Sequence, residues 1–106
     1  MSFTPLTDAQ LATIREAEPL AIVVNFPIFG ECVYKRPKFS DVLRWQQVIK
    51  SGGDGTYIVR SGNVLWPPSA EYEATIAQEA SGLPLTAMNA VMQAIGVGAE
   101  FDVGKR

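Results

Sequence analysis

Cys32 is the most reactive side chain in this sequence, because a thiolate can act as a nucleophile. A catalytic cysteine needs a neighbouring base or a strongly cationic environment to lose its proton. The sequence contains no histidine, and the cations near Cys32 in the chain are Lys35, Arg36 and Lys38. We therefore interpret Cys32 as a buried structural thiol. A small enzyme that uses Cys32 remains an alternative hypothesis.

Acidic residues could in principle supply a general acid and a general base: Glu31, Asp41, Asp54, Glu71 and Glu73. Two-carboxylate catalysis requires a fixed separation across a cleft, whereas these residues stand where helix caps and solvated faces explain them. The glycine-rich stretch 51–55 lacks the Lys-Ser/Thr end of a phosphate-binding loop. With no histidine and one cysteine, the usual metal ligands are also missing. The sequence therefore predicts no catalytic, cofactor or metal site.

Composition and charge set the class of protein. Hydrophobic residues make up 47% of the sequence and charged residues 19%, which is typical of a single globular domain over residues 1–106. We expect an N-terminal arm over 1–7 and a C-terminal tail over 99–106. The formal net charge of −2 gives no field that would attract nucleic acid or an anionic membrane. The sequence shows no leader pattern and no membrane-spanning run, so we expect a cytoplasmic protein.

The first predicted element is a short helix over Asp8–Ala17. Thr7 or Asp8 can cap it, and Pro19 ends it. Leu11 and Ile14 share one face of this helix. Because the apolar stripe is narrow, the helix needs another element to lie against.

A β-hairpin is predicted next. Residues 20–26 and 28–36 are rich in β-branched and aromatic side chains and indicate two strands. Either Pro27 or Gly30 could form the turn between them. Because a two-stranded ribbon is rarely stable alone, we expect helices to cover one of its faces.

The second half of the chain is mainly helical by pattern. Apolar residues at helical spacing and polar breaks predict helices over residues 40–50, 69–80 and 85–95, with Ser69 as the cap of the second. Their expected buried faces are Val42, Trp45, Val48 and Ile49 in the first, Tyr72, Ile76 and Ala80 in the second, and Leu85, Met88, Val91, Met92 and Ile95 in the third. Residues 56–65 are ambiguous between helix and strand, and Pro67 with Pro68 ends this stretch after an extended Trp66. The predicted fold is α+β: an N-terminal β-ribbon packed on a small bundle of three or four short helices.

The order of motifs resembles small tail-assembly proteins of tailed bacteriophages, including tail-assembly chaperones. The matching features are an extended Val33-Tyr34-Lys35-Arg36-Pro37, then Val64-Leu65-Trp66-Pro67, then Glu79-Ala80-Ser81-Gly82-Leu83-Pro84 before a last helix. The resemblance covers about residues 30–96 and rests on short motifs. The chain departs from the pattern at Gly96-Val97-Gly98, where the family has an aromatic pair. The resemblance favours helix for 56–65.

The resemblance implies a non-enzymatic protein that acts by protein–protein contact. Its expected partners are phage tail proteins, such as the tape measure, tube or baseplate subunits, and it could form a homo-oligomer. It would act in the host cytoplasm during assembly, or stay in the virion as a small tail or baseplate component. A regulatory adaptor that binds peptide or nucleic acid through Tyr34–Phe39 is the main alternative, although a solvated bend also explains that basic stretch.

The candidate partner-binding residues belong to exposed apolar stripes and to the matching motifs: Leu11, Ile14, Arg36, Trp66, Met88 and Met92. Chaperones of this kind cover apolar surface on a client, which requires apolar surface of their own. Met88 and Met92 share one face of the last helix and could form an adaptable groove, or they could fill the core.

Overall fold

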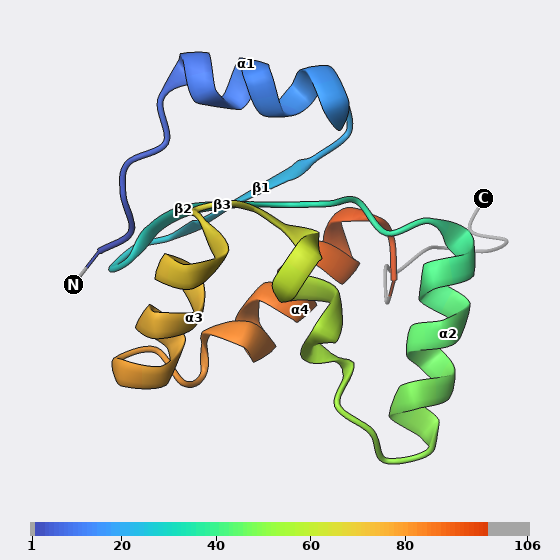
Figure 1. Cartoon of the computed structure of the whole chain (residues 1–106). Coiled ribbons are helices and arrows are strands. Elements are labelled where there is room, and N and C mark those ends of the chain that lie inside the picture. Colours follow the sequence, from blue (N-terminus) through green and yellow to red (C-terminus); the bar gives the residue numbers. More distant parts are fainter. Residues whose placement is uncertain (1, 98–106) are drawn as a thin grey trace, which may run out of the picture.

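The computed structural model describes residues 2–97, which form four α-helices and three β-strands (Figure 1). In chain order these are α1 (Asp8–Ala17), β1 (Ile22–Phe26), β2 (Gly30–Tyr34), α2 (Phe39–Lys50), β3 (Val64–Trp66), α3 (Ser69–Gln78) and α4 (Leu83–Ala94). Two 3-10 segments, η1 (Gly55–Val59) and η2 (Ser61–Asn63), connect α2 to β3. The mixed helix-and-sheet class is confirmed. The description of the ribbon as N-terminal is wrong, because α1, the helix predicted over Asp8–Ala17, precedes it, and the ribbon gains a third strand.

The sheet is antiparallel, with β2 between β1 and β3. The predicted hairpin is present, with Ile22 opposite Tyr34 and Phe26 opposite Gly30. Gly30 has a φ of +109°, a conformation that a side chain would disfavour, so it suits the point where the turn enters β2. The register shifts between β2 and β3 at Val33 and Tyr34, as in a β-bulge.

The main core lies on the sheet face covered by α3 and α4 (Figure 1). Alternate residues of β1 and β2 point into it, among them Ile22, Phe26, Cys32 and Tyr34. Helices α3 and α4, with the turn between them at Ala80, add further buried side chains: Tyr72, Ile76, Ala80, Leu83, Ala87, Val91 and Met92. The predicted stripe Tyr72, Ile76 and Ala80 is thus confirmed as a core face.

The opposite face of the sheet lies under α1 (Figure 1). Val33 is completely buried although it is outside the main core cluster, and it pairs with Val23 and Trp66 across the sheet. The helix has the bounds that the sequence predicts, and Thr7, one of the two expected caps, is its N-cap. It has no buried residue of its own, so it covers this face without becoming part of the core.

The N-terminal arm packs within its own chain. Phe3 is 3% exposed, donates its backbone N–H to the carbonyl oxygen of Phe29 at 2.7 Å, and stacks on Tyr72 with ring centroids 5.9 Å apart. Thr4 donates both its backbone N–H and its hydroxyl to the Glu71 carboxylate, each at 2.7 Å. Residues 2–7 are therefore anchored at Phe3 and Thr4. The predicted tail, 99–106, lies outside the described residues.

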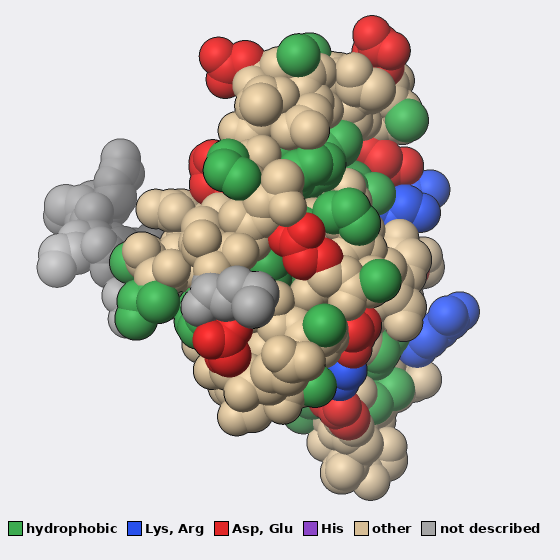
Figure 2. Space-filling view, turned by 60° about the vertical axis from the view of Figure 1, so that its left-hand side comes forward, with side chains coloured by type: hydrophobic (Ala, Val, Ile, Leu, Met, Phe, Trp, Pro, Cys, Tyr) green, Lys and Arg blue, Asp and Glu red, His purple; other side chains and the backbone are tan. Residues whose placement is uncertain are grey.

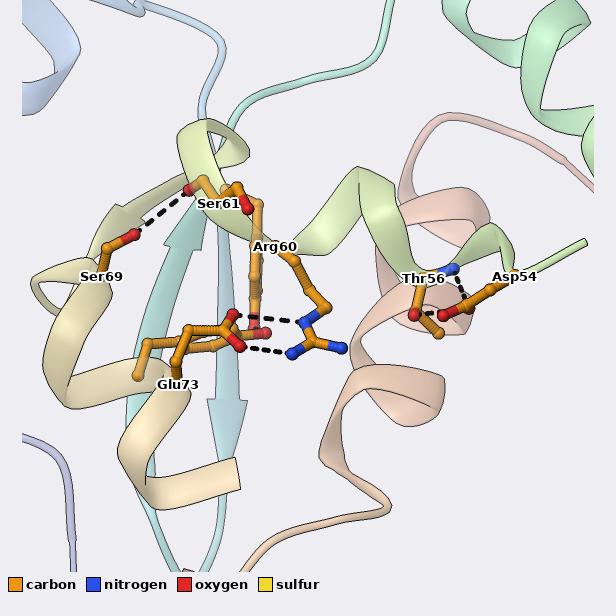
Figure 3. Close-up of polar contacts among 8 residues, drawn as sticks. Asp54, Thr56, Arg60, Ser61, Ser69 and Glu73 are labelled. Carbon is orange, nitrogen blue, oxygen red and sulfur yellow. Dashed lines mark hydrogen bonds and ion pairs between the residues drawn. The ribbon is translucent and has the colours of Figure 1, made fainter. Parts of the chain in front are cut away.

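The segment between α2 and α3 differs from the helix predicted over 56–65. Its first part is helical only as 3-10 turns, and its end, Val64–Trp66, is a strand because it pairs with β2. The sequence also suggested Ser69 as the cap of α3. Instead, the Ser69 hydroxyl donates to the carbonyl oxygen of Ser61 at 3.4 Å, and Ser61 has a left-handed backbone with φ of 54° (Figure 3).

Candidate functional site

Two of the predicted partner-binding residues meet in a groove between α1 and β3. Ile14 and Trp66 line this groove of about 390 Å³ together with Leu65. The indole N–H of Trp66 donates to the carbonyl oxygen of Thr4 at 3.0 Å, so the arm fixes the ring. Leu11 is half-buried on the same helix. Hydrophobic side chains are visible beneath the helix at the top of Figure 2.

The structure places the other three candidates elsewhere. Met92 is 3% exposed in the main core, and Met88 packs against that core from the edge. The exposed apolar residue of α4 is Leu85, which is 58% exposed and was predicted to be covered. Arg36 lines a separate cavity that shares no residue with the groove under α1. The six predicted residues therefore do not form one site.

Cys32 is completely buried beside two tyrosines. Burial is the main reason why the pKa of its thiol rises to about 12, and the negative charge of Glu71 adds to this, while a hydrogen bond with Tyr34 opposes it. At neutral pH the thiol is protonated and out of reach of a substrate. This environment suits a structural thiol rather than a nucleophile.

Two of the candidate carboxylates interact with neighbours on either side of η1 (Figure 3). Asp54 accepts hydrogen bonds from the backbone N–H and the hydroxyl of Thr56, at 2.9 and 2.6 Å, and these bonds lower the pKa of its carboxyl group. The Glu73 carboxylate accepts hydrogen bonds from both Nε and Nη2 of Arg60 in a bidentate ion pair. Asp54 thus caps the 3-10 segment, and Glu73 ties it to α3.

The remaining acidic candidates also occupy structural positions. Asp41 accepts the backbone N–H of Lys38 at 2.8 Å at the start of α2, and Glu71 holds Thr4 of the arm. Glu31 is exposed on the hairpin. Within residues 2–97, no group of three or more His, Cys, Asp or Glu side chains is placed to hold a metal ion.

A basic segment, Lys35–Lys38, connects β2 to α2 and borders a cavity of about 460 Å³. The backbone N–H of Lys35 donates to the carbonyl oxygen of Asn63 at 2.9 Å, and Nε of Arg36 donates to the carbonyl oxygen of Leu20 at 3.0 Å. The connector is therefore held in place while the side chains of Lys35, Arg36 and Lys38 remain exposed. Tyr34, by contrast, is buried, so of the two aromatic rings in the predicted stretch Tyr34–Phe39 only that of Phe39 is available to a ligand.

Helix α2 stands beside the body of the protein and rests on η1 (Figure 1). The contact is close: a Cβ added to Gly55 would lie 2.5 Å from Nε1 of Trp45 and 2.6 Å from Cδ1 of Ile49. The Nε1 atom is buried and has no hydrogen-bond partner among the described residues. No residue of α2 is fully buried, so the predicted burial of Val42, Trp45, Val48 and Ile49 is only partial.

The outward side of α2 carries two large apolar side chains that are not among the six predicted partner-binding residues, although Phe39 ends the Tyr34–Phe39 stretch of the adaptor alternative. Phe39 is 78% exposed and Leu43 is 46% exposed. The width of the apolar face of α2 could have indicated them, because a single neighbouring segment cannot cover so wide a face. We call Phe39 and Leu43, with Gln46 and Lys50 on the same helical face, the α2 stripe.

Comparison of the chain with protein-family models, with curated proteins and with solved structures finds no match. Along the part that the structure describes, no helix is both long and apolar enough to cross a bilayer. The surface of the molecule and the order of its motifs are therefore the features that bear on its function.

Proposed function

We propose that this protein is a tail-assembly chaperone, or a small tail or baseplate component, of a tailed bacteriophage, and that it acts by binding other proteins. The observation that carries the binding role is the exposed apolar side of α2, with Phe39 at 78% and Leu43 at 46% exposure. The phage assignment rests on the motif order from Arg36-Pro37 to Gly82-Leu83-Pro84.

An exposed apolar stripe on a small domain supports a contact role for a physical reason. Single exposed apolar residues are ordinary, but neighbouring ones on one helix expose apolar area that folding leaves uncovered. Burial of such area contributes about 25 cal/mol per Å², so a partner that covers the stripe gains binding energy. The groove at Ile14 and Trp66 offers a second, partly covered apolar surface.

The test is co-expression of this chain with phage tape-measure, tube and baseplate proteins whose genes lie beside its own. We expect at least one of them to co-purify with the chain, and to be more soluble in its presence. An unrelated protein of similar size serves as the control. If none of these tail proteins binds and none gains solubility, the proposed function is wrong.

A regulatory adaptor remains the second candidate because Lys35, Arg36 and Lys38 are exposed beside Phe39. Cations next to an exposed aromatic ring are a feature of single-strand nucleic-acid binding. The overall net charge of −2 opposes it. Filter binding of a single-stranded oligonucleotide at low and moderate salt separates the two functions, because phosphate contacts weaken steeply with salt.

A further inference from the structure

We propose that the α2 stripe and the basic segment before it bind an acidic amphipathic helix of the partner protein. The inference rests on the proposed function and names the chemistry of the partner. Phe39, Leu43, Gln46 and Lys50 follow one another at helical spacings, so they form a single line along the free side of the helix.

The other side of α2 is already in use. Trp45 lies against Gly55 of η1, and Cδ1 of Ile49 reaches the same glycine although Ile49 remains 43% exposed. The body of the protein therefore holds α2 at Trp45 and leaves Phe39 largely exposed and Leu43 about half exposed. A partner can reach the stripe with α2 in the position the structure gives it.

Charge selects the kind of partner. Residues 35–50 contain five cations and one carboxylate, a net charge of +4, which leaves −6 for the rest of a chain whose total is −2. The side of the molecule toward α3 and the N-terminal arm shows scattered acidic side chains, with Lys and Arg mostly near one edge (Figure 2). Among residues 2–97, most of the positive charge therefore lies on α2 and the segment before it.

These cations are available to a ligand. They are exposed, and none of them forms an ion pair within the part of the chain that the structure describes: Lys35, Arg36, Lys38, Arg44 and Lys50. The carboxylate of the segment, Asp41, accepts the backbone N–H of Lys38. A partner that brings carboxylates to this surface therefore meets unpaired positive charge next to apolar area.

The shape of the surface favours a helix as the occupant. The stripe runs along the 12 residues of α2, about 18 Å, with Lys38 before its apolar start and Lys50 at its other end. A helix of similar length can place apolar residues on Phe39 and Leu43 and acidic residues near both ends. A nucleic acid would engage the cations but leave the apolar side chains exposed. Helix α1 of a second copy is acidic, but its Ile14 is already committed to the groove with Trp66.

The experiment uses synthetic peptides and the full chain in calorimetric titrations. The probe has about 14 residues, roughly four helical turns, with leucines at i, i+3, i+4 and i+7 and glutamates in its first and last turns. One control peptide carries lysines in place of the glutamates. A second keeps the composition of the probe but scrambles the spacing of the leucines. We expect the acidic amphipathic peptide alone to bind, and to bind more weakly as salt shortens the Debye length from about 30 Å at 0.01 M to about 8 Å at 0.15 M.

Matched variants locate the contact. F39A/L43A and K35E/K38E should each weaken binding of the acidic peptide about tenfold or more, whereas I28A and L85A, at equally exposed apolar positions elsewhere, should leave it unchanged. Circular dichroism checks that every variant is folded. Equal binding of the scrambled peptide, no binding of the acidic peptide, or unchanged binding by the α2 variants would overturn the proposal.

Two further outcomes count against it. Sedimentation that shows a dimer lost in F39A/L43A would make a second copy the occupant, and tight binding of a single-stranded oligonucleotide lost in K35E/K38E would make it nucleic acid. Failure of this inference is distinguishable from failure of the proposed function. If a tail protein co-purifies equally with wild type and F39A/L43A, the function stands and the α2 site is wrong. If the acidic peptide binds but no tail protein does, the α2 site stands and the proposed phage function is wrong.

Discussion

The hydroxyl oxygens of Tyr34 and Tyr72 lie 3.0 Å apart inside the core, and so join the central strand of the sheet to helix α3. Both rings are completely buried and meet edge to face, with centroids 6.1 Å apart. The thiol of Cys32 also interacts with the Tyr34 hydroxyl. Polar atoms at this depth favour one packing arrangement because each needs its particular partner.

The first prediction concerns this pair. Y72F leaves the Tyr34 hydroxyl without its main partner and should lower the free energy of unfolding by about 1–2 kcal/mol. The double variant Y34F/Y72F should cost less than the sum of the single variants, because both buried hydroxyls are then absent. Urea unfolding of the four proteins measures the coupling, with Y57F at an exposed position as the control. Additive losses would show that the two hydroxyls do not depend on each other.

The second prediction concerns alkaline pH. Burial is the main cause that raises the pKa of Cys32 to about 12 and that of Tyr72 to about 12, and it raises the pKa of Tyr34 as well. The unfolded chain loses these protons at lower pH than the folded chain. The contribution of these groups to the free energy of unfolding is therefore fully present below about pH 9. It is lost as the pH rises from about 9 to 12, by up to about 1.4 kcal/mol per pH unit for each group.

Urea unfolding at a series of pH values measures this loss. In C32A the decline should begin nearer pH 10 than pH 9, because only the tyrosines remain to titrate. A wild-type stability that stays constant to pH 11 would contradict the burial of these groups.

The third prediction compares two phenylalanines. Phe3 is 3% exposed in the core, and Phe39 is 78% exposed on α2. F3A should lower the free energy of unfolding by about 3–5 kcal/mol because it leaves a cavity beside Tyr72 and Phe29. F39A should change it by less than about 0.5 kcal/mol. Similar effects from both substitutions in thermal or urea unfolding would show that the arm does not pack as described.

The fourth prediction concerns the seat of α2. A methyl group at Gly55 would clash with Trp45 and Ile49, whereas one at Gly62 would meet nothing within 4 Å. G55A should therefore displace α2 and lower the free energy of unfolding by about 1–3 kcal/mol. G62A is the control and should remain close to wild type. Equal stability of the two variants would mean that α2 does not rest closely on η1.

Local signals in the sequence explain what could be predicted. Helix α1 has its predicted bounds because its cap, Thr7, and its first turn lie next to each other in the chain. The hairpin follows in the same way from two β-branched runs separated by a short turn. Both elements depend on residues within a few positions of each other.

Contacts between distant parts of the chain explain what could not. Val64–Trp66 is a strand because it pairs with Val33 and Tyr34, about thirty positions earlier, and no local pattern reveals that partner. The burial of Phe3 depends likewise on Phe29 and Tyr72. The exposed side of α2 could not be predicted for the same reason. The sequence shows that the apolar face of this helix is wide, but it does not show how much of that face the rest of the chain covers.

The two tryptophans lie in different environments, so their intrinsic fluorescence can report on two separate parts of the molecule. Trp45 lies on α2, where its indole N–H has no acceptor in the described structure, while Trp66 lies under α1 with its N–H bonded to Thr4. Their emission should therefore differ in wavelength, and W66F would leave Trp45 as a single tryptophan, whose emission reports on the surroundings of α2. A ligand that occupies α2 and a ligand that enters the groove beneath α1 would consequently give separable spectral changes, without any attached dye.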